Sequence, residues 1–377
     1  MNNDCRELYI GLMSGTSMDG IDSAIIELKQ HEIKLVATYS HPIPKLLQQA
    51  IKPLFLPGDD NIDALGSADQ QLGICFAQAT TALLKRAGLN ASDITAIGSH
   101  GQTVRHRPPS SDTPHPFTLQ IGDPNIIAAR TGITTVADFR RRDMALGGQA
   151  APLVPAFHHA VFHSKTHNRA IVNIGGISNI TLLPVDGEVI GFDTGPGNRL
   201  LDDWIKQHKN KNFDDGGQWA SQHASDAQLL EQLKTHPFLQ RPAPKSTGRE
   251  EFNRQWLDQE LKPFSHLSPG AVQATLLACT AETIADALKA LPVELDEVYI
   301  CGGGALNTTL MTRLSDLLAP ANVDCTAALG ISPEWVEAAA FAWLARQTLA
   351  GLAGNLPAVT GAKGLTVLGG IYPSYAE

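Results

Sequence analysis

The sequence predicts an α/β protein whose two halves repeat one arrangement of strands. Apolar strands alternate with helices along the chain, which is typical of an α/β architecture with largely covered sheets. A strand, a glycine-containing turn and a second strand open the chain at residues 8–28, and the same unit returns about 160 residues later at residues 169–183. A chain of 377 residues also exceeds one ordinary core, so we expect two domains.

The first half begins with strands predicted at residues 7–12, 21–28 and 33–40, and alternating polar and apolar side chains support the second of them. A helix is predicted over residues 62–86, because Gly88 follows it in the usual C-terminal position. The remaining elements of this half are a strand, a short helix that Asp123-Pro124 opens, and another strand, at residues 94–99, 124–131 and 134–137.

The second half restarts with strands predicted at residues 169–174, 177–183 and 189–192. Its later elements are a helix from residue 198, a helix over residues 271–289, a strand at 297–301, and helices from residues 307 and 334.

The same pattern suggests domain boundaries. We expect an N-terminal domain of residues 1–135 plus about 345–377, and a C-terminal domain of residues 136–344. Residues 209–260 are polar and weakly patterned, so helical insertions are expected at about residues 205–265.

Composition narrows the function classes. The formal net charge of −9 argues against a nucleic-acid partner, although Arg140, Arg141 and Arg142 indicate a local basic site. Five single cysteines without a CxxC pair favour a reducing compartment. The first residues are polar, and the chain has no apolar run of membrane-spanning length. We therefore expect a cytoplasmic protein that does not span a membrane.

The loop between the first two strands is the first candidate site. Its glycines and small hydroxyl residues can direct N–H and O–H groups toward phosphate oxygens, and Asp19 or Asp22 could hold a hydrated Mg²⁺. An ordinary glycine-bearing hairpin explains the same residues equally well, and the P-loop pattern is absent. The candidate nucleotide-binding residues here are Gly15, Thr16, Ser17, Met18, Asp19, Gly20, Ile21 and Asp22.

Two further glycine turns are candidates for nucleotide binding. The turn within residues 173–181 reads as a simple hairpin when taken alone, and as an opposing phosphate clamp when paired with the first loop. The turn at residues 301–307 joins a strand to a helix, and three consecutive glycines let backbone approach a flat ligand such as adenosine, although a plain turn remains an alternative. The candidate residues are Gly175, Gly176, Asn179, Gly302, Gly303, Gly304 and Asn307.

Two carboxylates are candidates for catalysis. Asp193 follows an apolar strand and precedes a Gly-Pro-Gly turn, a position where ligands of open α/β sheets bind, so it could act as a general base. A local turn or cap role for Asp193 is the alternative. Glu337 lies in an almost entirely apolar helix, where a carboxylate needs a partner, so it either lines a substrate site or forms a buried salt bridge.

Polar residues after other strands are candidates for substrate binding. Residues 98–106 and 138–148 each follow a predicted strand, and such positions suit substrate hydroxyls or a carboxylate. The candidates are His100, Thr103 and Arg140.

In order, the motifs of the chain resemble those of the anhydro-N-acetylmuramic acid kinases. The resemblance runs from about Leu8 to Trp343 and rests on GLMSGTSMDGID, GSHGQTVRHRP, QIGDPNIIAARTGI, VADFRRRDMALGGQAAPLVP, NIGGISNITLLP, GFDTGPGN, DDGGQWA, KSTGREEFN and CGGGALN.

The resemblance implies a fold and a reaction. The fold would be two duplicated actin-like (ribonuclease H-like) domains with a hinged central cleft. ATP would phosphorylate O6 of 1,6-anhydro-N-acetylmuramic acid while water opens the anhydro ring, giving N-acetylmuramic acid 6-phosphate in murein recycling. The family also implies Mg²⁺ and a homodimer.

The resemblance further implies roles for individual residues. Asp193 would take a proton from the attacking water, and Glu337 would bind substrate and help to orient that water. Mg²⁺ would lie near Asp19, held through water. Arg140 is expected to meet the lactyl carboxylate of the substrate, and His100 is a further candidate. The alternatives are an ATP-binding regulator of the actin and Hsp70 type and a kinase for an ordinary hexose.

Overall fold

The computed structural model forms two compact units. They comprise Met1–Val161 with Trp335–Glu377, and Phe162–Glu334. No helix among the residues placed by the structure is long and apolar enough to cross a membrane. The structure describes residues 7–15, 18, 20–29, 32–55, 58, 61–109, 113–243, 245–248 and 251–375.

The first unit contains a six-stranded sheet in the order β13-β7-β4-β1-β2-β3. Strand β1 pairs antiparallel with β2 and parallel with β4, β2 pairs antiparallel with β3, and β4 is parallel to β7. These strands are β1 (Glu7–Met13), β2 (Gly20–Lys29), β3 (Glu32–Pro42), β4 (Ala96–Ser99), β7 (Thr135–Ala137) and β13 (Gly370–Tyr372).

The second unit repeats this topology in a five-stranded sheet with the order β10-β9-β8-β11-β12. Its first strand is again antiparallel to the second and parallel to the fourth, and its second and third strands are antiparallel. The expected duplicated α/β architecture is thus confirmed. The strands are β8 (Arg169–Ile174), β9 (Ile177–Leu183), β10 (Ile190–Pro196), β11 (Glu297–Cys301) and β12 (Asn322–Cys325).

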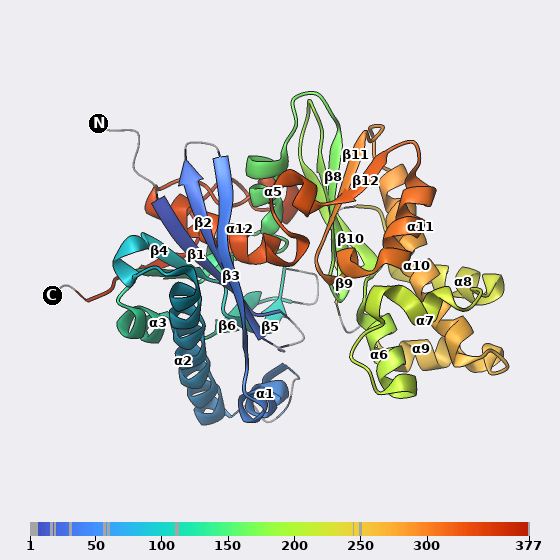
Figure 1. Cartoon of the computed structure of the whole chain (residues 1–377), viewed down its shortest axis with the longest axis horizontal. Coiled ribbons are helices and arrows are strands. Elements are labelled where there is room, and N and C mark those ends of the chain that lie inside the picture. Colours follow the sequence, from blue (N-terminus) through green and yellow to red (C-terminus); the bar gives the residue numbers. More distant parts are fainter. Residues whose placement is uncertain are drawn as a thin grey trace. The chain divides into compact units, whose positions relative to one another are not determined.

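Helices cover both sheets, and Figure 1 shows α11 beside β12 in the second unit. The helices of the first unit are α1 (Lys45–Ile51), α2 (Ile62–Ala87), α3 (Pro124–Thr131), α4 (Phe139–Ala145), α5 (Val154–Phe162, which ends at the first residue of the second unit), α12 (Val336–Leu349) and α13 (Pro357–Thr360). Those of the second unit are α6 (Arg199–Lys209), α7 (Gln218–Ser221), α8 (Ala227–Lys234), α9 (Arg254–Glu260), α10 (Pro269–Lys289) and α11 (Thr308–Leu318).

Helix α12 lies directly on the first sheet because two adjacent strand positions lack side chains. Gly11 of β1 and Gly98 of β4 are partners in the parallel register. A Cβ on Gly11 would lie 1.7 Å from the carbonyl oxygen of Ala338, and one on Gly98 would lie 1.9 Å from that of Phe341. Only glycine permits this approach of helix backbone to strand backbone.

This contact explains why the units divide the chain where they do. Residues 335–344 were expected in the C-terminal domain, but α12 packs on β1 and β4 and therefore belongs to the first unit. Residues 136–161 also group with the first unit. Within them, the ring of Phe139 lies 5.6 Å from that of Phe341 on α12.

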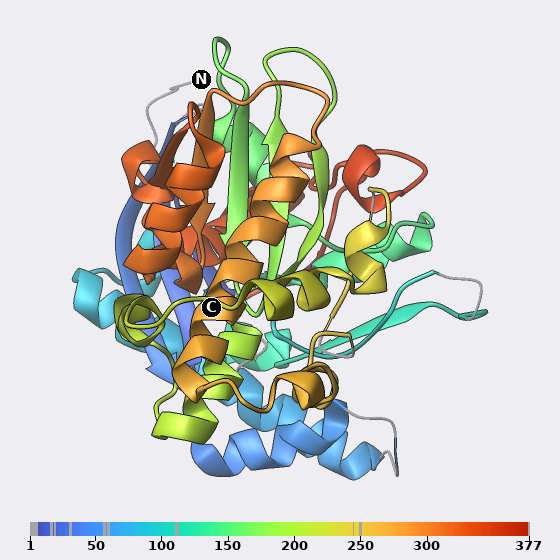
Figure 2. The ribbon, with the colours of Figure 1, turned by 90° about the vertical axis from the view of Figure 1, so that its right-hand side faces the viewer.

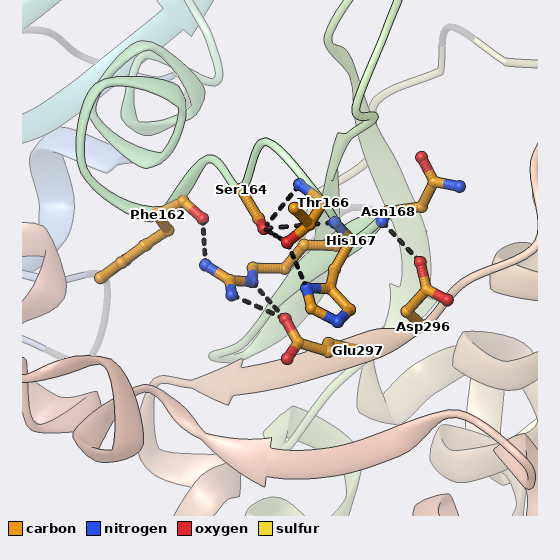
Figure 3. A network of polar contacts seen from close by, with 8 residues as sticks. Phe162, Ser164, Thr166, His167, Asn168, Asp296 and Glu297 are labelled. Atoms are coloured by element: carbon orange, nitrogen blue, oxygen red, sulfur yellow. Dashed lines mark hydrogen bonds and ion pairs between the residues drawn. The ribbon is translucent and has the colours of Figure 1, made fainter.

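The segment that leads into the second unit is held by a network of polar contacts (Figure 3). Arg169 donates to the carbonyl oxygen of Phe162 and forms a 2.6 Å ion pair with Glu297. The N–H of Asn168 donates to the carboxylate of Asp296 at 2.7 Å, and the N–H groups of Asp296 and Glu297 donate back to the Asn168 carbonyl. The segment from Phe162 onward is therefore fixed to β8 and β11 of its own unit.

One predicted strand is longer in the structure, and one pair of strands was not predicted at all. Strand β10 does not end before Asp193 but continues to Pro196, because a bulge between Asp193 and Gly195 keeps it paired with β9. Gly195 has φ 144, which only glycine adopts without strain. The strands β5 (Gln102–Arg107) and β6 (Phe117–Ile121), which the pattern did not predict, form a separate two-stranded ribbon that extends as an arm (Figure 2).

We predict that Gly98→Ala lowers the free energy of unfolding of the first unit by about 2–3 kcal/mol, because the new methyl group forces α12 away from β4. Urea unfolding followed by circular dichroism measures the change. The matched control is Gly66→Ala on the exposed side of α2, where no atom lies within 4 Å of the added Cβ; this change should leave stability equal or raise it by up to about 1 kcal/mol. Equal effects of the two substitutions would contradict the packing argument.

Candidate functional site

The loop between β1 and β2 is tied to the β5–β6 ribbon. The hydroxyl of Ser14 donates to Oε1 of Gln102 at 2.8 Å, and both side chains are buried. The side chains of Met18 and Ile21 are buried in the core of the first unit, so these two positions have only backbone atoms for a ligand. The candidates Thr16, Ser17 and Asp19 lie outside the described residues.

The two loop glycines have different surroundings. No atom of the described residues lies within 4 Å of a Cβ built on Gly15, so none of them packs against this side of its backbone. A Cβ on Gly20 would lie 3.0 Å from the carbonyl oxygen of His41, so close packing of β2 on β3 accounts for this glycine. Of the pair, Gly15 is therefore the stronger candidate for a ligand contact.

A charged group lies at the carboxyl ends of the parallel strands of the first sheet. His100 directly follows β4, Arg140 follows β7, and Asp22 pairs with Met13 at the end of β1. Nε of Arg140 donates to Nε2 of His100 at 3.0 Å. The charges of Arg140 and Asp22 both act on the pKa of Glu337 in the first turn of α12. The fold thus gathers four of the predicted residues at one edge of the sheet, where open α/β sheets bind ligands.

The two hydrogen bonds of the His100 ring require a neutral imidazole that donates through one nitrogen and accepts through the other. Its Nδ1 lies 2.8 Å from the carbonyl oxygen of Gly101 and must donate to it, while Nε2 accepts from Arg140. Burial, and secondly the charge of Arg140, lower the pKa of His100 well below its usual value. The ring also lies 4.7 Å from that of Phe341 on α12. His100 therefore orients Arg140 and carries no charge at neutral pH.

Arg140 and Glu337 are held in a partly desolvated environment. Burial lowers the pKa of Arg140 to about 10, and the charges of Glu337 and Asp143 oppose this change. Burial raises the pKa of Glu337, although the charge of Arg140 lowers it in turn. A guanidinium and a carboxylate that are partly removed from solvent interact strongly with a polar ligand.

Arg140 is further supported by a buried carboxylate. Its Nη1 donates to the carbonyl oxygen of Ala150 at 2.6 Å, and the N–H of Ala150 donates to Asp143 at 2.9 Å. Asp143 is fully buried and also accepts from Asn355 and Thr360. Through Ala150, this network of hydrogen bonds fixes the position of the Arg140 guanidinium. The remaining candidate of this unit, Thr103, lies on β5 and accepts from Gln120 at 3.0 Å.

In the second unit, Asp193 is held by a loop that runs along strand β10. The N–H of Asp193 donates to the carbonyl oxygen of Lys245 at 2.9 Å, and Oδ2 accepts from the N–H of Thr247 at 2.9 Å. Burial raises the pKa of Asp193 to about 6, against the Thr247 N–H, which lowers it. A carboxylate with this pKa is ionised at neutral pH and is a stronger base than an exposed aspartate.

The Gly175-Gly176 turn connects β8 and β9 beside the beginning of α6. The carbonyl oxygens of Gly175 and Gly176 accept from the N–H groups of Asn198 and Gly197 at 2.8 and 3.0 Å. Gly176 is exposed, and Asn179 is the cross-strand partner of Asp193 in the register of β9 and β10. The fold therefore brings this turn and the candidate base onto neighbouring positions of one hairpin.

The triple glycine has a different structural reason from the one expected. A Cβ on Gly302 would lie 2.4 Å from Oδ1 of Asn173, and one on Gly304 would lie 2.4 Å from Cβ of Ile174, so packing on β8 accounts for both glycines. Gly303 is exposed, and only Nδ2 of Asn198 lies near its Cβ position, at 3.6 Å. Asn307 caps α11 by accepting from the N–H of Leu310 at 3.0 Å.

Two residues near the candidate site were not singled out from the sequence. Gln102 anchors the Ser14 loop, and Thr247 holds the Asp193 carboxylate through its N–H while its own buried hydroxyl lacks a partner among the described residues. No local pattern in the sequence marks either residue. Only the pairing of distant segments, residues 14 with 102 and 193 with 247, reveals them.

Comparison with known proteins yields one family. Residues 7–374 match the model of the anhydro-N-acetylmuramic acid kinase family. An anhydro-N-acetylmuramic acid kinase of Shewanella loihica is 53% identical over 98% of this chain and 99% of its own length, and that of Shewanella woodyi is 51% identical over the same shares. An ADPNP-bound activator of 2-hydroxyisocaproyl-CoA dehydratase from Clostridium difficile covers 89% of this chain and 92% of its own, at 11% identity and a TM-score of 0.45, a similarity that carries no information on activity.

We predict that Asp193→Asn stabilises the protein at high pH. Because the pKa of Asp193 is raised from 3.8 to about 6 in the fold, its ionisation lowers the free energy of unfolding as pH rises through this interval. The difference between variant and wild type should grow from near zero at pH 4 to at most about 3 kcal/mol at pH 8. Denaturant unfolding across this range measures it, with Asp186→Asn in the exposed turn after β9 as the control. A difference independent of pH would show that Asp193 does not titrate in this range.

Proposed function

Because the chain belongs to the anhydro-N-acetylmuramic acid kinase family, we propose that it converts 1,6-anhydro-N-acetylmuramic acid, ATP and water to N-acetylmuramic acid 6-phosphate and ADP. The observation that carries the proposal is the environment of Asp193, whose carboxylate is half-buried, held by one backbone N–H and has a pKa of about 6. Such a group accepts a proton from water at neutral pH.

In the proposed reaction, Asp193 removes a proton from a water molecule as the water adds to C1 of the sugar. The bond between C1 and O6 of the anhydro bridge breaks, and its electron pair stays on O6. This oxygen attacks the γ-phosphorus of ATP, and ADP leaves. The proton remains on Asp193 until it passes to solvent. Opening of the ring and transfer of the phosphoryl group thus use the same oxygen, which requires close positioning of all reactants.

The charged group of the first unit is proposed to bind the sugar. Arg140 is fixed by His100 from one side and by the Ala150 carbonyl from another, so its guanidinium is preorganised for the lactyl carboxylate. Glu337 would accept from a sugar hydroxyl or from the attacking water. Thr103 is also proposed to bind a sugar hydroxyl. Its own hydroxyl already accepts from Gln120 and keeps its O–H for donation to the sugar.

The glycine turns of both units are proposed to bind ATP. Support comes from Gly15, whose Cβ position no described residue packs against, and from the exposed backbone of Gly176 and of Gly303. The other candidate nucleotide-binding residues of these turns are proposed to contribute as well. Four of them, Ile21, Gly302, Gly304 and Asn307, also have packing or capping roles. In this proposal residues of both units contribute to binding of ATP and of the sugar, so we expect the ligands to close a cleft.

Mg²⁺ belongs to the proposal as the ion that neutralises phosphate charge. The chemistry of the site fits it, since Asp22 supplies a carboxylate oxygen at the end of β1 and interacts electrostatically with Glu337. Asp19 remains the proposed ligand, through water.

A cytoplasmic location and a homodimer complete the proposal. Murein recycling supplies the substrate inside the cell, and the scattered single cysteines suit a reducing compartment. No nucleic-acid or membrane partner is proposed for a chain with a net charge of −9.

We predict that Asp193→Asn lowers turnover by roughly 10²–10⁴-fold, since it removes the proposed base and keeps the size of the side chain. A coupled assay of ADP release with 1,6-anhydro-N-acetylmuramic acid measures turnover, and nucleotide binding should stay unchanged. Asp186→Asn, which changes an exposed aspartate of the same unit, should keep wild-type turnover. Turnover of Asp193→Asn near the wild-type rate would place the base elsewhere.

We also predict that oxygen from solvent enters the product at C1. Reaction in H₂¹⁸O followed by mass spectrometry should give one ¹⁸O per product molecule at the C1 hydroxyl, because water opens the ring. Unlabelled C1 at early reaction times, before exchange through the open-chain sugar, would indicate an ordinary kinase reaction without ring opening.

A further inference from the structure

A cavity of about 490 Å³ lies in the second unit, against the edge strand β10. Its walls come from β10, the second half of α10 and the residues just after it, the end of α8, residues 239–243 and Lys245. The volume is in the range of sites that hold small molecules. No step of the proposed reaction uses this cavity.

The cavity and the Asp193 carboxylate lie on opposite faces of β10. Ile190 and Phe192 line the cavity, and Asp193 is the next residue along the strand. Successive side chains of a strand point to opposite faces of the sheet, so Asp193 points away from the cavity. The cavity is therefore separate from the space into which Asp193 projects.

The lining combines an apolar floor with one cation, Lys245, that forms no ion pair among the described residues. Ile190, Phe192 and Leu291 supply apolar surface, and Lys234, Arg241 and Lys245 are set against one carboxylate, Asp286. An apolar floor with few charged groups is typical of a site that binds an amphipathic ligand, and the charge of Lys245 favours an anion.

Lys245 is the cation best placed for a ligand. Lys234 already forms ion pairs with Glu282 and Asp286 at 3.0 and 2.9 Å, and Arg241 is half-exposed and pairs with Glu251 at 3.2 Å. Nζ of Lys245 donates to two carbonyl oxygens and lies 4.8 Å from the centre of the Phe238 ring, and no carboxylate of the described residues forms an ion pair with it. Burial, and secondly the charge of Arg241, lower the pKa of Lys245, so an anionic ligand would also relieve the cost of its charge.

We propose that this cavity is a second binding site, which takes a small anion with an apolar group, and that its occupation alters the function of Asp193. The apolar group lies on the Phe192 floor, and the anionic group meets Lys245. Carboxylates and phosphate monoesters share this chemistry. The inferred binding does not depend on the proposed kinase reaction.

The same short segment connects the cavity to Asp193. The side chain of Lys245 lines the cavity, while its carbonyl oxygen accepts from the N–H of Asp193. Two residues later, the N–H of Thr247 donates to the Asp193 carboxylate. A ligand that moves Lys245 therefore also moves the backbone that holds the Asp193 carboxylate. Coupling between two sites requires that a ligand at one site favour one arrangement of the other, and this shared backbone supplies the connection.

Isothermal titration of the full chain with phenyl phosphate and with phenylacetate tests the binding. We expect saturable binding of at least one of them at a single site, and at least tenfold weaker binding of inorganic phosphate, which lacks the apolar group. Ala290→Phe fills the cavity from its exposed rim, at the C-cap of α10, and should weaken binding at least tenfold, as should Lys245→Met. Lys289→Met, one position away on the same helix and outside the cavity lining, should bind as the wild type does.

Unchanged affinity in Ala290→Phe would place the ligand elsewhere and overturn the proposal, and so would absence of binding to the wild-type chain. The coupling is tested by turnover at a saturating concentration of the bound probe, where we expect at least a twofold change in the wild type and none in Ala290→Phe. Equal turnover with and without the probe, while binding persists, would overturn the coupling alone. Loss of kinase activity under all conditions would contradict the proposed function and leave the binding result as it stands.

Discussion

The backbone contact between α12 and the first sheet is the constraint from which the charged group of that unit follows. Gly11 and Gly98 are partners in the register of β1 and β4. The carbonyl oxygens of Ala338 and Phe341 occupy the space that side chains at these two positions would need. Glu337 immediately precedes Ala338, and Phe341 is one turn further along the same face and packs on the ring of His100. A helix seated one side-chain layer higher would hold neither the carboxylate nor the ring at the carboxyl ends of β4 and β7.

The second unit uses the same strand order but positions its candidate catalytic carboxylate differently. Asp193 lies on an edge strand, and a loop more than fifty residues later in the chain satisfies both its N–H and its carboxylate. The cover of this loop partly desolvates the carboxyl group and raises its pKa to about 6. In the first unit burial also raises the pKa of Glu337, and the charge of Arg140 opposes part of this rise. Two duplicated units thus give two carboxylates with different environments, which is the condition for different chemical roles.

Glycine patterns in the sequence had more than one physical cause. Gly302 and Gly304 resemble a ligand-binding turn, yet their missing side chains make room for Asn173 and Ile174 of β8. The same turn leaves Gly303 exposed. In the Gly175-Gly176 turn both carbonyl oxygens accept hydrogen bonds, while Gly176 is exposed to solvent. Close packing of backbone at a turn and access for a ligand are therefore compatible at neighbouring positions.

The sequence by itself determined the α/β class, the duplicated strand–turn–strand units, most strands of both sheets and the family, because these depend on local periodicity and on contiguous motifs. Asp193, Arg140, His100 and Glu337 were singled out as candidates from the same contiguous motifs, and their functional roles are proposals. Only the tertiary structure decided that β10 continues past Asp193, that α12 belongs with the first sheet, and that Gln102 and Thr247 support the site. Each of these depends on contacts between residues distant in the chain, and no local pattern encodes which distant backbone will supply the missing partner.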